Sequence, residues 1–584
     1  MFRLLFGGFV ATAGAALGSA PALAEESEIY PLAEVRVGQE GVWRTVVEGE
    51  EIREFNLRIL GVVEHFAGPG QPVIMAEALD PEHILSGPVA GMSGSPVYID
   101  GRIVGAYAYG YLWPKEQAVI GITPIERMLE IFDLPEAAPE REVASVGGRS
   151  RPFVKAASSA DGPGQARLEA VPAPLMLGGF SERTIAAFRD ELVALGFSAS
   201  ASPQGSAEAI ELNLRPGAPV AGVLMQGDFS AAATGTITWT DGQRLLAFGH
   251  PFMQAGPIEL PLAGADVITV VRNLRSSFKL SNIGPPAGRL YQDRLTGIAG
   301  ELGEVPRMTS LQLAVQPNAR EPVNYEAELW PHPEYLPLLT AMSVLQSTSE
   351  SIFAEAEQSM RLAGRIQLAG GEELAWETRS TGAQAGLQLA LDTYARLGEV
   401  INNPFEPLAV TSVEMSLEAV SGVASTVLRQ VQVGDARPRP GSLLPVTLHL
   451  QDYRGVDHRL ELEVPIPDDL ASGQEIELVI TDAAGANEVL AASRRSANDV
   501  RDLLARWREQ RPEGYVYAFL TAAENAPEVD GQSLPGLPPS IAATLSGEAT
   551  DFIVASGGRY VRWETRASVD GVFSGQNRRT LRMR

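Results

Sequence analysis

The segment Gly91-Met92-Ser93-Gly94-Ser95-Pro96 (GMSGSP) is the part of the sequence that decides the fold. Its glycines allow a tight turn that exposes a serine oxygen and lets a substrate approach closely. In this Gly-x-Ser-Gly-x-Pro pattern Ser93 is the candidate nucleophile, and the N–H groups of Gly91 and Ser93 can form an oxyanion hole. Ser95 is the alternative nucleophile. A plain small-residue turn before a hairpin is the alternative interpretation of the whole segment.

Strand signals surround this turn. Residues 54–63 (EFNLRILGVV) precede it, and residues 97–99 and 102–109 (VYI, RIVGAYAY) follow it. Asp100-Gly101 joins the two later segments, which predicts a hairpin because both turn residues need positive φ. Thr123 as N-cap and Pro124 as first helical residue then predict a short helix to about Phe132.

A second hairpin leads to the best candidate for a catalytic base. Residues 235–240 (GTITWT) are followed by Asp241-Gly242, and the return strand ends at Gly249-His250. A serine nucleophile needs a base, usually histidine, and a strand end beside a glycine can hold one fixed and accessible. The remaining histidines have weaker surroundings. They are His65, His83, His332, His449 and His458.

The rest of the chain alternates helical and strand patterns. A helix is predicted from Ser181 to Leu195, where Ser181 can cap and Gly196 can end it. Residues 333–365 are expected to begin as helix and return to strand, and residues 498–507 to form a helix. Strands at 444–450 and 459–464 (LPVTLHL, RLELEV) predict an immunoglobulin-like sandwich near the C-terminus.

Composition limits the possible partners. A chain of 584 residues is long enough for several domains, and its net charge of −26 argues against nucleic acid and anionic membrane surfaces as partners. It contains no cysteine, which excludes disulfides, zinc-thiolate sites and a cysteine nucleophile. We expect no cofactor and no metal. The oligomeric state does not follow from the sequence.

The N-terminus has the pattern of a secretory signal. Arg3 precedes an apolar run over residues 4–17, and Ala22-Leu23-Ala24 supplies small residues for cleavage after Ala24. The run is short for a membrane span, so we expect an exported protein, periplasmic or extracellular, with no integral membrane segment after cleavage. An uncleaved N-terminal anchor is the alternative.

Several of these segments together resemble the sporulation factor IVB (SpoIVB-type) serine peptidases, which have a chymotrypsin-like character. The similar stretches are residues 41–60, 79–85 (LDPEHIL), 91–96, 120–129 (IGITPIERML) and 235–250. In that family the histidine segment precedes the serine segment, whereas here Ser93 comes before His250. An exchange of two half-barrels along the chain explains this order, because a triad depends on geometry and not on chain order.

The resemblance implies a function and a third catalytic residue. It makes the protein an exported serine endopeptidase acting on proteins or peptides, with Asp80 as the carboxylate of a Ser93, His250 and Asp80 triad. Asp266 and Asp228 are the alternatives nearest His250 in sequence. The family also implies self-processing, for which residues 137–173, rich in Pro, Gly, Ser and Ala, are the most accessible place.

Two other functions stay open. A pseudo-peptidase would keep the fold and act as an envelope binding or scaffold protein, and a hydrogen bond between Ser93 Oγ and His250 would argue against it. A purely structural cell-surface β protein would require both motifs to arise by chance.

The predicted fold is mainly β. A chymotrypsin-like double β-barrel core, with its halves in permuted order, is followed by a C-terminal β-sandwich-like accessory domain. The expected order is signal peptide 1–24, serine half 30–135, linker 136–175, small α/β insert 176–225, histidine half 226–320, mixed α/β region 321–435 and accessory domain 436–584.

Overall fold

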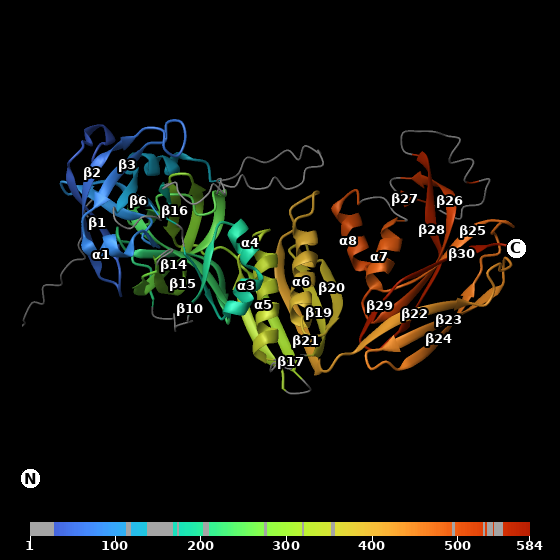
Figure 1. The fold of residues 1–584 in the computed structure, drawn as a ribbon. Coiled ribbons are helices and arrows are strands. Elements are labelled where there is room, and N and C mark those ends of the chain that lie inside the picture. Colours follow the sequence, from blue (N-terminus) through green and yellow to red (C-terminus); the bar gives the residue numbers. More distant parts are fainter. Residues whose placement is uncertain are drawn as a thin grey trace, which may run out of the picture.

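The computed structural model describes most of the chain (Figure 1). The described residues are 28–111, 118–136, 168–171, 174–202, 210–273, 277–317, 321–351, 357–492, 497–529, 532–533, 541 and 553–584. The predicted signal peptide and most of the predicted linker lie outside them. Within the described residues, no helix is long and apolar enough to cross a membrane.

The N-terminal part closes into a six-stranded barrel in the order β5-β1-β2-β3-β7-β6, with β6 pairing back to β5. Strand β2 shows which side of the sheet faces the core, because Phe55, Leu57 and Ile59 are buried and alternate with exposed residues. The strands are β1 (Glu40–Val46), β2 (Ile52–Val63), β3 (Val73–Ala78), β5 (Ser95–Ile99), β6 (Arg102–Tyr111) and β7 (Val119–Pro124).

A second six-stranded barrel follows in the order β12-β13-β16-β15-β14-β11, and β11 pairs back to β12. In both barrels the first three strands are neighbours in chain order and the last three return in reverse order. The strands are β11 (Pro219–Gly227), β12 (Ser230–Thr240), β13 (Arg244–Ala247), β14 (Gly256–Val271), β15 (Ser277–Arg294) and β16 (Gly297–Leu302). The predicted double barrel is therefore present.

The two barrels share an apolar interface. Ile103 and Ala106 of β6 pack with Leu246 of β13 and Tyr291 of β15 in one buried cluster. Short elements complete the barrels and the connection between them. They are η1 (Leu32–Glu34), α1 (Pro81–Ser86), β4 (Val89–Ala90), α2 (Ile125–Leu129), η2 (Glu130–Asp133), β8 (Leu168–Ala170), β9 (Pro174–Gly178), α3 (Glu182–Ala187), α4 (Arg189–Ala194) and β10 (Ser198–Ser202).

The sheet of the second barrel continues into a middle region through the pairing of β11 with β18. Two long helices, α5 and α6, lie side by side against this sheet (Figure 1). The elements are β17 (Thr309–Pro317), β18 (Val323–Leu329), α5 (Tyr335–Ser351), β19 (Gln358–Leu368), β20 (Glu373–Thr381), α6 (Ala385–Ile401) and β21 (Val410–Ser421).

The C-terminal part contains two sheets over one core, as predicted for a β-sandwich-like domain. Leu448 of one sheet and Leu478 of the other belong to the same buried cluster. The first sheet comprises β22 (Ser425–Val433), β23 (Leu443–Asp452), β24 (Asp457–Pro465) and β29 (Val572–Ser574). The second comprises β25 (Glu475–Thr481), β26 (Tyr515–Val529), β27 (Gln532–Ser533), β28 (Ile553–Ser568) and β30 (Asn577–Arg582). Helix α7 (Ala483–Ala492) packs against this sheet, whereas α8 (Val500–Arg508) packs against β20 of the middle region.

Most local predictions hold. The Asp100-Gly101 turn has positive φ at both residues, at 50° and 77°. The predicted helix from Ser181 is present but divides at Phe188 into α3 and α4. Thr123 is a correction: it does not cap a helix, because β7 runs through Pro124 and α2 starts only at Ile125. Its hydroxyl instead donates to the Gly249 carbonyl of the other barrel, at 2.5 Å.

Candidate active site

The serine loop connects β4 to β5 at the junction of the two barrels. Gly91 and Gly94 have φ of 93° and 94°, so both positions need glycine. Ser95 Oγ donates to the Met92 carbonyl at 2.6 Å, which occupies this alternative nucleophile. Ser93 Oγ is fully buried and has no hydrogen-bond partner within the described residues. Of the two serines, Ser93 is therefore the one whose hydroxyl is uncommitted.

Strand β12 of the second barrel holds the serine loop from the side. The Thr236 N–H donates to the Ser93 carbonyl at 2.9 Å, and Thr236 Oγ1 donates to the Gly91 carbonyl at 2.9 Å. Thr238 Oγ1 donates to the Gly94 carbonyl at 2.7 Å. Three carbonyls of the loop are thus bound by one strand, and the Gly94 N–H donates to the Tyr107 carbonyl at 2.8 Å. Such fixed backbone geometry is what an oxyanion hole requires.

Lys279 of β15 is buried directly behind this loop. Its side chain lies against Gly91, and Nζ donates to Thr45 Oγ1 at 2.8 Å and to Thr236 Oγ1 at 3.1 Å. Burial lowers the pKa of Lys279 to about 7. Such an amine can act as a base, but Ser93 Oγ is not among its partners. The contacts therefore make Lys279 a group that links Thr45 of the first barrel to Thr236 of the second.

The first prediction concerns the pH dependence that this buried amine gives to stability. Burial depresses the pKa of Lys279 in the folded protein. Between pH 7 and about 10 the Lys279 amine is therefore neutral in the folded protein but charged in the unfolded chain. The wild type should gain stability over that window by at most about 1.4 kcal/mol per pH unit. Below pH 7 the Lys279 amine is charged in both states, so its contribution to the free energy of unfolding does not change with pH. Thermal unfolding from pH 6 to 10 should show this slope in the wild type and lose it in Lys279→Met. Equal slopes would contradict the assignment.

His250 lies at the end of β13, where it enters the same interface. Phe248 and Gly249 both have φ of 69°, and a side chain at Gly249 would meet Ala106 and Ala108 of β6. His250 is 3% exposed. Its Nδ1 lies 2.7 Å from the Pro251 carbonyl oxygen, so Nδ1 carries the proton. Nε2, which has no partner within the described residues, is then the unprotonated nitrogen that a general base needs.

The electrostatic surroundings keep His250 neutral. Burial lowers the pKa of its imidazole below the usual value, and the backbone carbonyls of Pro251 and Val171 only partly oppose this. Val171 follows β8, and its N–H donates to the Ala108 carbonyl of β6. The segment that ends the predicted linker therefore passes directly beside the candidate base.

Asp293 fixes the loop that begins with His250. Its buried carboxylate accepts the N–H groups of Phe252 at 2.8 Å, Met253 at 2.6 Å and Ala255 at 3.1 Å. Burial raises the pKa of Asp293, and these backbone donors oppose the rise. A carboxylate with three amide donors from one loop determines the shape of that loop. Sequence reasoning did not select Asp293, because nothing local distinguishes it from other strand-end aspartates.

Asp80 lies elsewhere, at the start of α1. Its carboxylate accepts the Asn56 N–H, and Asn56 Nδ2 lies 3.4 Å from its other oxygen. The charge of Asp80 acts on His83, one turn later, where burial lowers the pKa of the imidazole and Asp80 partly opposes that shift. Among the described contacts none joins Asp80 to His250. Asp266 and Asp228 also have no described contact with His250; Asp228 instead accepts the Glu326 N–H at 2.7 Å.

His83 is a second buried histidine near the serine loop. Its Nε2 lies 3.4 Å from the Tyr107 hydroxyl, and its ring packs edge-on against Trp43. Burial lowers the pKa of His83 to about 4, although Asp80 and Glu82 oppose the shift. The Tyr107 carbonyl also accepts the Gly94 N–H, so Tyr107 contacts both His83 and the serine loop. His83 lies in the family-like stretch 79–85, but its local pattern does not mark it as buried.

The structure brings Ser93 and His250 to opposite sides of the same interface. A side chain at Gly94 would meet Phe248, two residues before His250, and both loops lie against residues 106–108 of β6. Ser93 Oγ and His250 Nε2 do not hydrogen-bond to each other, since neither has a partner in the described part of the chain. Catalytic hydrogen bonds are often long in unliganded enzymes and tighten with substrate.

A comparison with known proteins finds a family match in the N-terminal part of the chain. Residues 13–129 match the family described as SpoIVB peptidase S55. This segment is similar to the SpoIVB peptidase family. The match contains Ser93 and Asp80 but ends before the second barrel, so His250 stands outside it. No curated protein and no solved structure matches the chain.

The match makes the first barrel similar to the peptidases of the SpoIVB family. The second barrel has the same strand order and supplies the histidine loop. The barrel with the candidate nucleophile Ser93 comes first in the chain, and the barrel with the candidate base His250 comes second.

Proposed function

We propose that the protein is an exported serine endopeptidase in which Ser93 attacks peptide carbonyls and His250 is the base. The observation that carries this is the serine loop itself. Its backbone is clamped by Thr236 and Thr238 of the opposite barrel, while Ser93 Oγ is uncommitted. The predicted signal sequence supports export.

The chemistry follows from this arrangement. His250 Nε2 takes the proton of Ser93 Oγ as the oxygen attacks the scissile carbonyl, while the Pro251 carbonyl holds the proton on Nδ1. The N–H groups of Gly91 and Ser93 stabilise the oxyanion. The imidazolium then protonates the leaving amine, and water hydrolyses the acyl-enzyme by the reverse sequence.

The family resemblance supplies Asp80 as the carboxylate of the triad, and the geometry offers Asp293 as the residue that positions the histidine loop. We expect Asp293→Asn to lower kcat by about 10²-fold or more, and Asp80→Asn to lower it less. The reason is that an amide NH₂ would face either the Phe252 N–H or the N–H groups of Met253 and Ala255, and each of these arrangements sets donor against donor. Steady-state kinetics of both variants, with thermal unfolding as a control for folding, decides between them. A loss of kcat confined to Asp80→Asn would return the role to Asp80.

Self-processing is part of the proposal. The family resemblance suggests it, and Val171, at the end of the predicted linker 137–173, lies beside His250. Incubation of the purified chain should then yield fragments cut within this linker, and Ser93→Ala should stay intact.

Active-site labelling tests the proposed function directly. The mature protein is incubated with a fluorophosphonate probe, and the modified peptide is identified by mass spectrometry. We expect the adduct on Ser93 within GMSGSP, with Ser95→Ala labelled like the wild type. An adduct on another serine, or none on folded protein, would refute the nucleophile assignment.

A second candidate function is an inactive envelope binding or scaffold protein. The observation that favours it is the burial of both residues, since Ser93 is 0% and His250 3% exposed and no hydrogen bond joins them. The same labelling experiment separates the two functions, because a scaffold would stay unmodified by the probe.

A further inference from the structure

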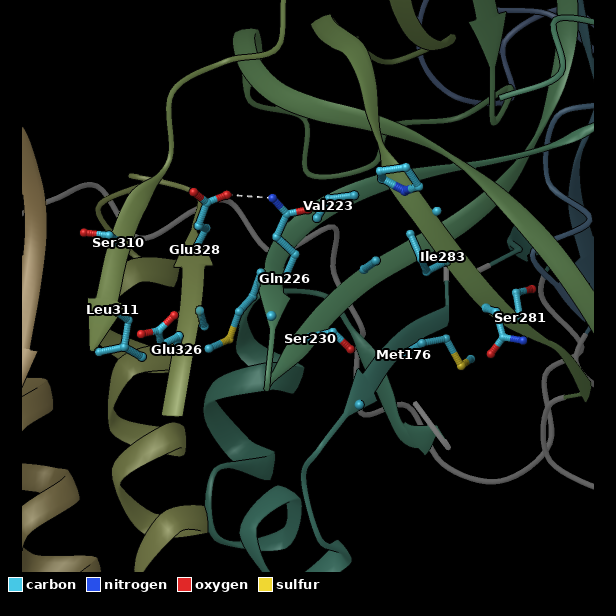
Figure 2. Close-up of a pocket in the computed structure, with 18 of the residues that line it drawn as sticks. Met176, Val223, Gln226, Ser230, Ser281, Ile283, Ser310, Leu311, Glu326 and Glu328 are labelled. Atoms are coloured by element: carbon cyan, nitrogen blue, oxygen red, sulfur yellow. Dashed lines mark hydrogen bonds between the residues drawn. The ribbon is translucent and has the colours of Figure 1, made fainter. Parts of the chain in front are cut away.

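A groove of about 520 Å³ lies between the second barrel and the middle region (Figure 2). Strands β9, β11 and β12 form its floor, and β15 borders it on one side and β17 and β18 on the other. Figure 2 shows Ser281 and Ile283 on the β15 side and Glu326, Glu328, Ser310 and Leu311 on the opposite side. Its volume is in the range of specific ligand sites.

The floor of the groove is apolar and its far rim is acidic. Met176, Val223, Met225 and Ala232 line the floor. Glu326 and Glu328 are exposed on the rim, where Glu328 accepts the Gln226 amide at 2.7 Å. No lysine or arginine is among the described lining residues. The groove therefore suits apolar groups followed by a positive charge.

Two strands connect the groove to the candidate active site. On β12, Thr236 binds the serine loop, Thr234 follows on the same face, and Ala232 and Ser230 line the groove. Ala232 is four residues from Thr236, which is about 13 Å along a strand. The Oγ1 atom of Thr234 is buried and has no partner within the described residues.

Strand β15 makes the same connection on the other side. Lys279 contacts the serine loop at Gly91, and Ser281, two residues later on the same face, lines the groove. This separation is about 7 Å. Ser281 is 2% exposed, and its hydroxyl has no partner within the described residues. Unpaired buried hydroxyls between a nucleophile and a groove can hydrogen-bond to a ligand backbone that passes over them.

We propose that this groove binds an extended segment of a peptide substrate about four residues from the bond that Ser93 cleaves. The segment presents apolar side chains at alternate positions to the floor and a lysine or arginine to Glu326 and Glu328. This inference rests on the proposed peptidase function. An extended chain is the occupant that fits, because its alternate side chains face one side and its length per residue matches the distance from Thr236 to Ala232.

Peptide binding to the Ser93→Ala background tests this without turnover. The probes are fluorescein-labelled 12-residue peptides with valine or leucine at alternate positions and a terminal lysine, and matched peptides with serine in place of the apolar residues. We expect the apolar peptide to bind at least about tenfold more tightly by fluorescence anisotropy. Equal affinity for the two peptides, or no binding of either, would overturn the proposal.

Two variants locate the binding. Ser230→Phe, which fills the groove, should remove the preference for the apolar peptide. The matched control is Ser412→Phe on the neighbouring strand β21. Ser412 pairs with Ser310 of β17 but does not itself line the groove. Glu326→Lys with Glu328→Lys changes only exposed residues, so it should fold normally and remove the preference for a terminal lysine over the terminal alanine of a matched apolar peptide. An unchanged preference in these variants would place the binding elsewhere.

The two proposals fail separately. Fluorophosphonate labelling of the unmodified chain reports on Ser93 alone, because the small probe does not reach the groove. Labelling without peptide preference would retain the peptidase and reject the groove. Peptide preference without labelling would reject the peptidase and leave a peptide-binding protein.

Discussion

Replacing His250 by alanine is expected to lower kcat for peptide hydrolysis by about 10⁴- to 10⁶-fold, the scale seen when a serine peptidase loses its histidine. The reason is that Nε2 of His250 is the unprotonated nitrogen at the barrel interface, with its tautomer fixed by the Pro251 carbonyl. Fluorophosphonate labelling should slow in parallel. Steady-state kinetics on an unstructured protein substrate measures the effect.

The pH profile of the wild type adds an independent check. Because burial lowers the pKa of His250, the acidic limb of kcat/KM should fall below about 6.5, the ordinary histidine value. Activity is present above the His250 pKa, where the imidazole is neutral, and is lost as pH drops through it. An acidic limb above that value would point to a different base.

His83→Ala is the comparison that makes this result specific. His83 is equally buried, and Asp80 and Glu82 influence its pKa. Its removal should lower stability, because the ring packs against Trp43, but retain most of the activity. The reverse outcome, with activity lost in His83→Ala and retained in His250→Ala, would identify His83 as the base and Asp80 as its partner.

The sequence predicted the elements that depend on local patterns. Asp100-Gly101 set a hairpin, alternation in residues 54–63 set β2, and the motifs around Ser93 and His250 defined two halves. These features depend on turn chemistry and side-chain period, which neighbours in sequence determine. Two barrels followed from them because each half carries its own set of alternating strands.

The contacts between the halves were not predictable in the same way. Lys279, Thr236 and Asp293 acquire their roles from partners far along the chain. Thr123 illustrates the competing principle: its hydroxyl could cap a helix locally, yet it binds the Gly249 carbonyl across the interface. Where a polar side chain is buried between barrels, the available partner determines its contacts and local propensity does not.

The exchanged order of the halves agrees with these contacts. The contacts that the second barrel makes with the serine loop come from β12 and β15, while Tyr107 of the first barrel accepts the Gly94 N–H. Since both barrels have the same strand order, each can supply its half of the interface whichever is translated first. The interface, more than either motif, therefore determines whether the chain can be a peptidase.

Gly94→Ala tests that interface with the largest expected effect on stability. A Cβ at Gly94 would overlap the Thr236 carbonyl oxygen and the Phe248 backbone nitrogen, both in the second barrel, and the residue has φ of 94°. Positive φ costs about 1–2 kcal/mol for alanine, and a backbone clash that cannot relax raises the total to about 4 kcal/mol or more. Gly101→Ala is the matched control, since Gly101 has φ of 77° but open space around it, and it should cost only the conformational part. Calorimetry should show a much lower Tm for Gly94→Ala than for Gly101→Ala, with loss of fluorophosphonate labelling in Gly94→Ala alone. Similar Tm values for the two variants would mean that the barrels do not meet at this loop, and the proposed active site would lose its basis.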